Sequence, residues 1–175
     1  YKVDPNRKFF SANHEEIERG LTTDIYFIRA LEILNFLKLD ATEVTAEIFA
    51  RKAGVFAGMQ ETFNLLKDKK IKLWSLSEGD LFQPKETVMR IQGPYNEFGV
   101  YETIILGILG SSSAWATAAR ECCEVARGKK IICFGSRHIH PAVAPVMERA
   151  ALIGGVDGAS CILGAKLMGQ EPQGT

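Results

Sequence analysis

The segment whose residue types are best suited to binding or catalysis is Lys129–His138, because an apolar strand ends there in the tetrapeptide Gly-Ser-Arg-His. In parallel α/β proteins the carboxyl end of a strand is where ligands bind. The planar guanidinium of Arg137 can hold a phosphate or a carboxylate through two parallel hydrogen bonds. We therefore predict that Arg137 contacts an anionic ligand. The structural alternative is a salt bridge to a nearby acid.

Two histidines beside Arg137 allow a different chemistry. His138 either contacts the same anion or caps its loop, and His140 is expected to cap or pack. In an extended strand the two imidazoles would share a face, as paired metal ligands do in amidohydrolase barrels. The adjacent cation, the following Pro141 and the presence of only one further histidine, His14, count against a metal site. No metal ligand is predicted, and a metal-dependent barrel hydrolase remains an alternative.

The elements after this segment alternate between strand and helix. A helix is predicted from Pro141 to Gly154-Gly155, a short strand at 158–161 and a helical turn or two at 163–168. This alternation is typical of a parallel barrel or a doubly wound sheet. Since a full barrel takes about 250 residues, we expect residues 129–175 to form only the first part of one.

Residues 1–128 are predicted to form a mixed α+β domain that leads into the barrel. Capping residues and apolar periodicity predict its helices, and period-two alternation predicts its strands. The predicted helices are a short one capped by Ser11 or Asn13, one capped by Thr22 or Thr23, one at 56–66, one at 101–109 and one from Ser111–Ser113 to about Arg127; the strands are 42–50, 71–76 and 87–91, the last broken by Gly93-Pro94.

The helix predicted at residues 25–37 is apolar on almost every side. Its polar residues Arg29, Glu32 and Asn35 form one narrow stripe, so more than one of its faces needs a cover. We expect the core of its own chain to cover one face and another subunit to cover a second.

Polar residues near the second predicted strand have expected structural roles. Arg149 is expected to pair with an acid such as Glu102 across an interface. Asp157 and Ser160 either order neighbouring loops or are simple turn residues after Gly154-Gly155.

The composition is that of an ordinary globular protein. Of 175 residues, 46% are apolar, and 21 Lys and Arg balance 21 Asp and Glu, which argues against a general nucleic-acid binder. The apolar run Tyr101–Leu109 is too short to span a bilayer, and residues 1–13 contain no apolar core of a signal peptide, so a cytoplasmic protein is expected.

The four cysteines are predicted to be reduced, buried thiols. The first residue, Tyr1, and the terminal loop favour a fragment of a longer protein.

Five motifs together resemble nicotinate phosphoribosyltransferase, most closely the short archaeal and bacterial form of this type II phosphoribosyltransferase family. They follow the order and spacing of that family: Thr22–Tyr26; Gly93-Pro94-Tyr95 leading into Tyr101–Thr103; Phe134–Arg137; Ile153–Gly158; and Gly174-Thr175. The resemblance covers nearly the whole chain. It implies an α+β amino-terminal domain packed on an incomplete α/β barrel.

The activity that the resemblance implies is transfer of a phosphoribosyl group from phosphoribosyl pyrophosphate to nicotinate, giving nicotinate mononucleotide and pyrophosphate in NAD biosynthesis. Magnesium would accompany phosphoribosyl pyrophosphate, and many members use ATP as a co-substrate through a phosphorylated histidine. That histidine would follow Thr175, so no catalytic residue is assigned within the chain. The active sites would be shared between the subunits of a homodimer or larger homo-oligomer.

The same resemblance assigns further substrate-binding residues. Tyr26 corresponds to the tyrosine that stacks on the pyridine ring from the neighbouring subunit, although its position on an apolar helix also suits a core residue. His138 corresponds to a phosphate contact, and Thr175 to a threonine at the nicotinate site. Quinolinate and nicotinamide remain alternative pyridines, although Arg137 favours an acid. A non-catalytic assembly subunit is the alternative from another class.

Overall fold

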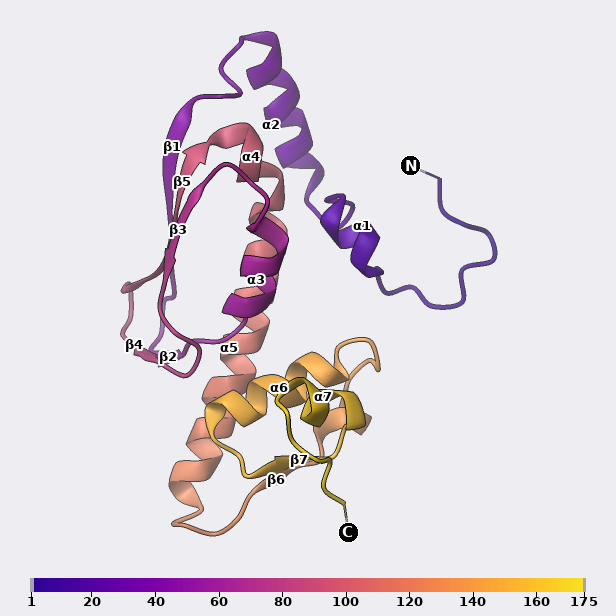
Figure 1. Cartoon of the computed structure of the whole chain (residues 1–175), viewed down its shortest axis with the longest axis vertical. Coiled ribbons are helices and arrows are strands. Elements are labelled where there is room, and N and C mark those ends of the chain that lie inside the picture. The colour runs from indigo at the N-terminus through magenta and orange to yellow at the C-terminus, as the bar shows by residue number, and fades with distance from the viewer. Residues whose placement is uncertain (1, 175) are drawn as a thin grey trace.

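A single long helix, α5 (Glu102–Val125), runs through the molecule and carries both of its parts (Figure 1). The computed structural model describes residues 2–174. The amino-terminal part packs around Ile104–Leu109 of this helix, and the part after residue 130 packs around Ala116–Ala119. Within residues 2–174 no helix, α5 included, combines the length and the apolar character that crossing a membrane requires.

The structure corrects the prediction of two helices in this region, because α5 continues through Ser111–Ser113. The hydroxyls of Ser111 and Ser113 form hydrogen bonds with groups other than the N–H groups at the start of a helix. Ser111 donates to the carbonyl of Gly107 at 2.7 Å, and Ser113 donates to the carbonyl of Ala57 at 3.2 Å and accepts from its N–H at 3.1 Å. A serine bonded along or across a helix does not start a new one.

The amino-terminal part is built on three antiparallel strands, with β5 in the middle. The sheet order is β1 (Glu43–Phe49), β5 (Thr87–Pro94), β3 (Lys72–Ser75). Exposure alternates along β1, as its sequence pattern predicts. The remaining elements of this part are β2 (Gly54–Val55), which pairs with β4 (Leu81–Phe82), and α4 (Tyr95–Phe98) and the 3-10 turn η1 (Gly99–Tyr101), which lead into α5.

The predicted break at Gly93-Pro94 is wrong, because Gly93 belongs to β5 and pairs with Val44. Glycine is needed there for a close approach of two backbones. A Cβ at this position would lie 2.9 Å from the carbonyl oxygen of Lys70. The glycine therefore serves packing rather than a turn.

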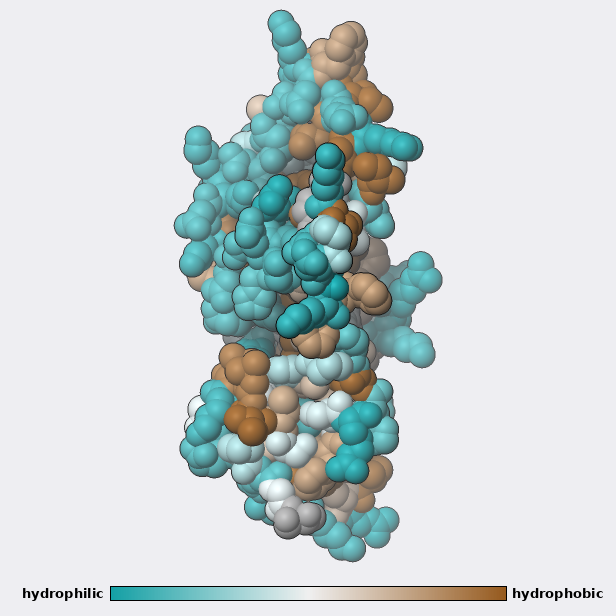
Figure 2. Space-filling model, turned by 90° about the vertical axis from the view of Figure 1, so that its right-hand side faces the viewer, coloured by the Kyte–Doolittle hydropathy of each residue, from teal (hydrophilic) through white to brown (hydrophobic). Residues whose placement is uncertain are grey.

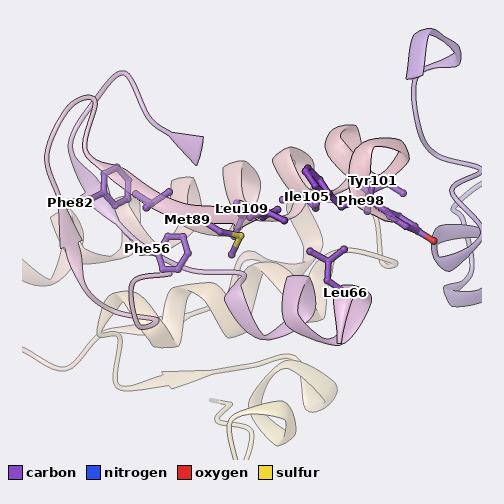
Figure 3. Packing of buried hydrophobic residues seen from close by; sticks show 11 residues of the cluster. Phe56, Leu66, Phe82, Met89, Phe98, Tyr101, Ile105 and Leu109 are labelled. Atoms are coloured by element: carbon purple, nitrogen blue, oxygen red, sulfur yellow. The ribbon is translucent and has the colours of Figure 1, made fainter. Parts of the chain in front are cut away.

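One face of the sheet packs on α5 and α3 (Met59–Leu66) to make the main core (Figure 3). Its largest fully buried apolar side chains are Phe56, Met89, Ile91 and Ile105. α3 begins three residues later than predicted, because its N-cap, Gly58, has a left-handed φ of 92° that a helix cannot contain.

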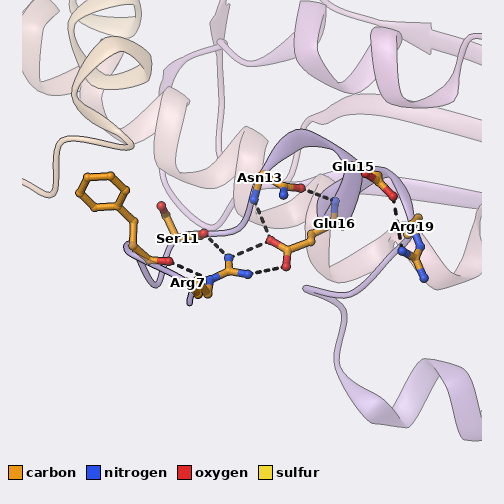
Figure 4. Close-up of polar contacts among 7 residues, drawn as sticks. Arg7, Ser11, Asn13, Glu15, Glu16 and Arg19 are labelled. Atoms are coloured by element: carbon orange, nitrogen blue, oxygen red, sulfur yellow. Dashed lines mark hydrogen bonds and ion pairs between the residues drawn. The ribbon is translucent and has the colours of Figure 1, made fainter. Parts of the chain in front are cut away.

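The first helix, α1 (His14–Glu18), is capped by Asn13, one of the two predicted caps. The Asn13 side chain accepts the N–H of Glu16 at 2.8 Å, and the Glu16 carboxylate accepts the N–H of Asn13 at 2.9 Å (Figure 4). This is a capping box. Arg7 pairs with the same carboxylate and so ties the preceding segment to α1.

The next helix, α2 (Ile25–Phe36), has Asp24 as its N-cap, so the prediction of Thr22 or Thr23 is wrong. The reason lies at the start of α5. The hydroxyl of Thr103 donates to the carboxylate of Asp24 at 3.1 Å and accepts its N–H at 3.2 Å. Two motifs of the family resemblance are thus hydrogen-bonded to each other.

The part after α5 consists of β6 (Ile132–Cys133), the 3-10 turn η2 (Gly135–His138), α6 (Ala144–Gly154), β7 (Gly158–Ala159) and α7 (Ile162–Leu167). β6 and β7 are parallel, with Cys133 opposite Ala159, which confirms the predicted strand and helix alternation. The described residues contain the start of a barrel and no closed one. α6 begins at Ala144 rather than Pro141, because a turn closed by the Val143 N–H to the His140 carbonyl comes first.

α6 packs so closely on α5 that Gly154 cannot carry a side chain. A Cβ there would lie 2.2 Å from the carbonyl oxygen of Ala116 and 2.8 Å from the Cβ of Ala119. The following Gly155 ends α6 with a φ of 110°, as the double glycine predicts. This contact sets the position of α6 and of every side chain that α6 carries.

A partly buried ion pair also joins the two parts. Arg149 of α6 donates to both carboxylate oxygens of Glu78, which lies between β3 and β4, at 3.1 and 2.6 Å. The two side chains are only 19% and 16% exposed. The expected pairing of Arg149 with Glu102 is therefore wrong, since a pattern in sequence does not show which loop reaches α6.

The ion pair and its burial shift the pKa values of two carboxyl groups. Burial alone would raise the pKa of Glu78, but the hydrogen bonds and charge of Arg149, with the N–H groups of Gln60 and Gly58, hold it below its usual value. Burial raises the pKa of Glu61 above its usual value, although the charge of Arg149 opposes this.

Two glycines, Gly154 in the contact between α5 and α6 and Gly107 outside it, should respond in opposite ways to substitution by alanine. Gly154→Ala should lower the free energy of unfolding by about 1–3 kcal/mol, because the new Cβ would overlap a backbone carbonyl. Gly107→Ala, where nothing lies within 4 Å of the new Cβ, should raise it by up to about 1 kcal/mol. Urea unfolding measures both. A Gly154→Ala variant as stable as the wild type would contradict the close contact.

The ion pair predicts a pH-dependent loss of stability. Because the folded-state pKa of Glu78 is lowered, its stabilisation is present above the usual carboxyl pKa and is lost as the pH falls through the lowered value. Glu78→Gln should cost about 1.5–3 kcal/mol at neutral pH and should flatten the acid side of the stability profile. The matched control is Glu124→Gln, in the exposed pair with Arg120, which should cost less than about 0.5 kcal/mol. Equal losses in the two variants would disprove this role.

Candidate functional site at the ends of the parallel strands

The end of β6 presents Arg137 and His138 to solvent. Both side chains lie in η2, directly after the strand, and both are exposed. No ion pair formed within residues 2–174 includes Arg137, so the alternative of a structural salt bridge is not realised there. The guanidinium is available to an anionic ligand.

The loop after β7 lies beside this turn. Because β6 and β7 are parallel, both strands end at the same edge. The N–H of Ser160 donates to the carbonyl of Cys133 at 3.0 Å, and Cys161 is the N-cap of α7. The turn that carries Arg137 and the beginning of α7 therefore lie next to each other at this edge.

A buried carboxylate links the two loops. Glu148 of α6 has no exposed surface, and its Oε1 accepts the hydroxyls of Ser136 at 2.6 Å and Ser160 at 3.1 Å. Its Oε2 accepts the N–H of Cys161 at 2.5 Å. Glu148 is absent from the site residues that the sequence predicts. The signal that could have found it is an acid within the otherwise apolar helix face at 143–153.

Asp157 orders the start of β6. Its carboxylate accepts the N–H of Ile131 at 2.7 Å, and its own N–H donates to the carbonyl of Ile131 at 2.8 Å. With the hydrogen bond of Ser160 to Glu148, this confirms the interpretation that Asp157 and Ser160 order neighbouring loops.

His140 has a structural role, as the sequence favours, but it does not cap α6, whose N-cap is Val143. Its Nδ1 accepts the N–H of Ala142 at 3.1 Å, within the turn before α6. Across the described part of the chain no three His, Cys, Asp or Glu side chains are grouped as potential metal ligands. The geometry therefore adds no support for a hydrolase that uses His138 and His140.

The cysteines are free thiols, as predicted, but they are less buried than predicted. Cys122 is exposed, and the other three are half-buried. Burial raises the pKa of Cys133, whose sulfur lies 3.8 Å from that of Met147. A thiol kept protonated is a poor nucleophile, so the strand-end edge offers Arg137 rather than this thiol for chemistry.

Tyr26 lies in the other part of the molecule. Its side chain is 68% exposed, so it is not a core residue, and its ring makes an edge contact with Phe27 at a centroid distance of 5.2 Å. Figure 1 places α2 at the far end of the sheet from β6 and β7. The structure does not bring Tyr26 and Arg137 together within one chain. The predicted contact at Thr175 lies outside the described residues.

The chain covers α2 less than the sequence predicts. α2 contacts its own chain at η1, but none of its residues is buried. Figure 2 shows apolar side chains gathered over the end of the molecule where α2 lies. They include Ile25 at 62%, Ile33 at 60% and Phe36 at 87% exposure.

Comparison with known proteins gives the family. The family model described as quinolinate phosphoribosyl transferase, N-terminal domain, matches residues 24–113, just over half of the chain. Nicotinate phosphoribosyltransferase pncB1 of Mycobacterium tuberculosis is 32% identical over 99 residues, which cover 57% of this chain and 22% of that protein. Nicotinate phosphoribosyltransferase 1 of Arabidopsis thaliana is 32% identical over 107 residues, which cover 60% and 19%. The chain spans less than a quarter of these relatives.

Solved structures agree in fold. The crystal structure of nicotinate-nucleotide pyrophosphorylase from Pyrococcus furiosus matches with a TM-score of 0.93 and 40% identity over 97% of this chain and 45% of that chain. Human nicotinic acid phosphoribosyltransferase matches with a TM-score of 0.80 and 20% identity over 88% and 39%, a likeness of fold alone. The resemblance to nicotinate phosphoribosyltransferase is thereby confirmed, and the chain belongs to the quinolinate phosphoribosyltransferase family, with the fold of that family's amino-terminal part.

Proposed function

We propose that the protein transfers a phosphoribosyl group from phosphoribosyl pyrophosphate to nicotinate, forming nicotinate mononucleotide and pyrophosphate for NAD biosynthesis in the cytoplasm. One observation carries the proposal. Arg137 stands exposed at the carboxyl end of β6, outside every ion pair of the described residues, in a chain whose relatives are named nicotinate phosphoribosyltransferase.

The chemistry needs a cation where Arg137 lies. Breaking the anomeric bond develops positive charge on the ribose and negative charge on the departing pyrophosphate, so donors fixed near the phosphates stabilise the transition state. The guanidinium can donate two parallel hydrogen bonds to a phosphate or to the nicotinate carboxylate. His138, exposed in the same turn, is proposed as a second phosphate contact.

Magnesium and ATP belong to the proposal as companions of the substrates. Magnesium would arrive with the pyrophosphate group, because the carboxylates near the site already have partners. Glu148 accepts three hydrogen bonds and Asp157 accepts the N–H of Ile131. Neither carboxylate is therefore proposed as a magnesium ligand. Coupling to ATP would use a histidine that the family resemblance puts beyond Thr175.

A homodimer with shared active sites would complete the proposed site. α2, which carries Tyr26, and β6, which leads into the turn with Arg137, lie at opposite ends of the molecule (Figure 1). The exposed apolar face of α2 needs a cover (Figure 2). If α2 covers the strand-end edge of a second chain, Tyr26 supplies a flat platform for the pyridine ring.

Quinolinate is the second candidate substrate. The matching family model favours it, since that model is named for quinolinate phosphoribosyl transferase. A product assay with phosphoribosyl pyrophosphate, magnesium and nicotinate, quinolinate or nicotinamide, with and without ATP, decides among the pyridines. Product from none of the three would favour the non-catalytic alternative.

The role of Arg137 predicts a large and specific loss of activity. In the protein expressed from its complete reading frame, Arg137→Ala should reduce kcat/KM for nicotinate by roughly 10²–10³-fold, because a fixed charge-assisted contact is removed. The control is Arg120→Ala, an exposed arginine of α5 paired with Glu124, which should leave kcat/KM within about twofold. Near-normal kinetics of Arg137→Ala would remove its assigned role.

The shared site predicts that mixing the subunits of two impaired variants restores activity. Tyr26→Ala and Arg137→Ala should each be impaired, and a dimer of one subunit of each kind would contain one intact site and one doubly altered site. Random reassociation of equal amounts should therefore recover about one quarter of wild-type activity. Steady-state assays before and after mixing measure this recovery. Activity that stays at the level of the unmixed variants would contradict a site shared in this way.

A further inference from the structure

Glu148 takes no part in the chemistry above, yet its carboxylate is fully buried. Both of its oxygens are occupied: Oε1 by the hydroxyls of Ser136 and Ser160, and Oε2 by the N–H of Cys161. These three donors come from two different loops, which follow the neighbouring parallel strands β6 and β7. One side chain on α6 thus holds both strand ends.

A contribution to stability does not by itself explain why a glutamate is buried at position 148. Burying a carboxylate carries a large desolvation penalty, and an apolar side chain of similar volume often gives an equally stable fold. A carboxylate does give a fixed geometry, because it accepts several donors at defined angles. We propose that Glu148 is a positioning residue for the phosphoribosyl transfer proposed above, on which this inference rests, and that it holds the turn carrying Arg137 against the loop that begins α7.

The contacts on either side of Glu148 show how positioning would work. Ser136 directly precedes Arg137, so its 2.6 Å hydrogen bond fixes the turn from which the guanidinium projects. On the other side, α7 lies against α6 at Gly164, where a Cβ would come within 3.0 Å of the Cβ of Glu148. The carboxylate is therefore enclosed, and a movement of either loop would break its hydrogen bonds.

Two substitutions separate hydrogen bonding from bulk. Glu148→Gln keeps the shape: its amide oxygen can accept the N–H of Cys161, and its amide nitrogen can donate to the hydroxyls of Ser136 and Ser160, which rotate to accept. Glu148→Ala removes all three contacts. We expect Glu148→Ala to lower kcat/KM for phosphoribosyl pyrophosphate by about 10²-fold, mainly through KM, because the guanidinium is misplaced. Glu148→Gln should stay within about fivefold of the wild type.

A double-mutant cycle distinguishes positioning from a general structural role. If Glu148 acts through Arg137, Glu148→Ala should reduce kcat/KM by less than about threefold in an Arg137→Ala background, because the group that it positions is already absent. The control is Ser113→Ala, which removes a hydroxyl bonded to the backbone of Ala57 in the other part of the molecule and should leave kcat/KM within about twofold. Losses of Glu148→Ala that multiply fully with those of Arg137→Ala would overturn the inference.

Hydrogen exchange tests the same contacts without any activity. The amides of 135–138 and 161–163 should exchange at least about tenfold faster in Glu148→Ala than in the wild type, while those of α5 stay unchanged. Unchanged exchange in these loops would overturn the inference even if the enzyme is active. A wild-type protein inactive with all three pyridines would instead remove the proposed function, and exchange alone would still decide whether Glu148 holds the loops.

Two milder variants cover the case in which Glu148→Ala does not fold. Ser136→Ala removes the donor next to Arg137, and Ser160→Ala removes the donor of the second loop. Ser136→Ala should raise KM for phosphoribosyl pyrophosphate roughly fivefold or more, and Glu148→Gln should remain close to the wild type. An unchanged KM in Ser136→Ala would overturn the inference.

Discussion

The close packing of α6 on α5 is the constraint on which the rest of the structure depends. At Gly154 the two helices approach so closely that a Cβ would meet the carbonyl of Ala116, so α6 can neither slide nor rotate without a clash. Neighbouring helix residues point about 100° apart. Once α6 is fixed, Glu148 is directed to the strand-end loops and Arg149 to Glu78 in the other part of the chain.

The adjacent side chains of Glu148 and Arg149 have their charges compensated in different ways. Arg149 and Glu78 form a pair that keeps some exposure, and the pair lowers the pKa of Glu78. Glu148 has no cationic partner among the ion pairs of the described residues and is satisfied by hydroxyl and N–H groups. The first contact joins the two parts of the molecule. The second joins two loops at the edge where Arg137 projects.

The sequence predicted local elements well and long-range partners poorly. Alternation in β1, the cap at Asn13 and the double glycine after α6 each act within a few residues, so local pattern is enough to show them. The patterns at Ser113 and Gly93 are misleading in sequence because the groups they contact, Ala57 and Lys70, lie far away along the chain. For the same reason the sequence alone does not reveal the role of Glu148, which exists only once β6, β7 and α6 have come together.

The candidate site shows the same division between local and long-range information. The type of Arg137 and its position after β6 indicate a ligand-binding role, whereas nothing near it in sequence indicates that Tyr26 belongs to the same site. Within one chain α2 and β6, the elements near these two residues, lie at opposite ends of the molecule (Figure 1). α2 also keeps large apolar side chains exposed. Covering that face would bury apolar area. The proposed dimer accounts for both features through one contact, since the surface that removes α2 from water is also the surface that would complete the pyridine site.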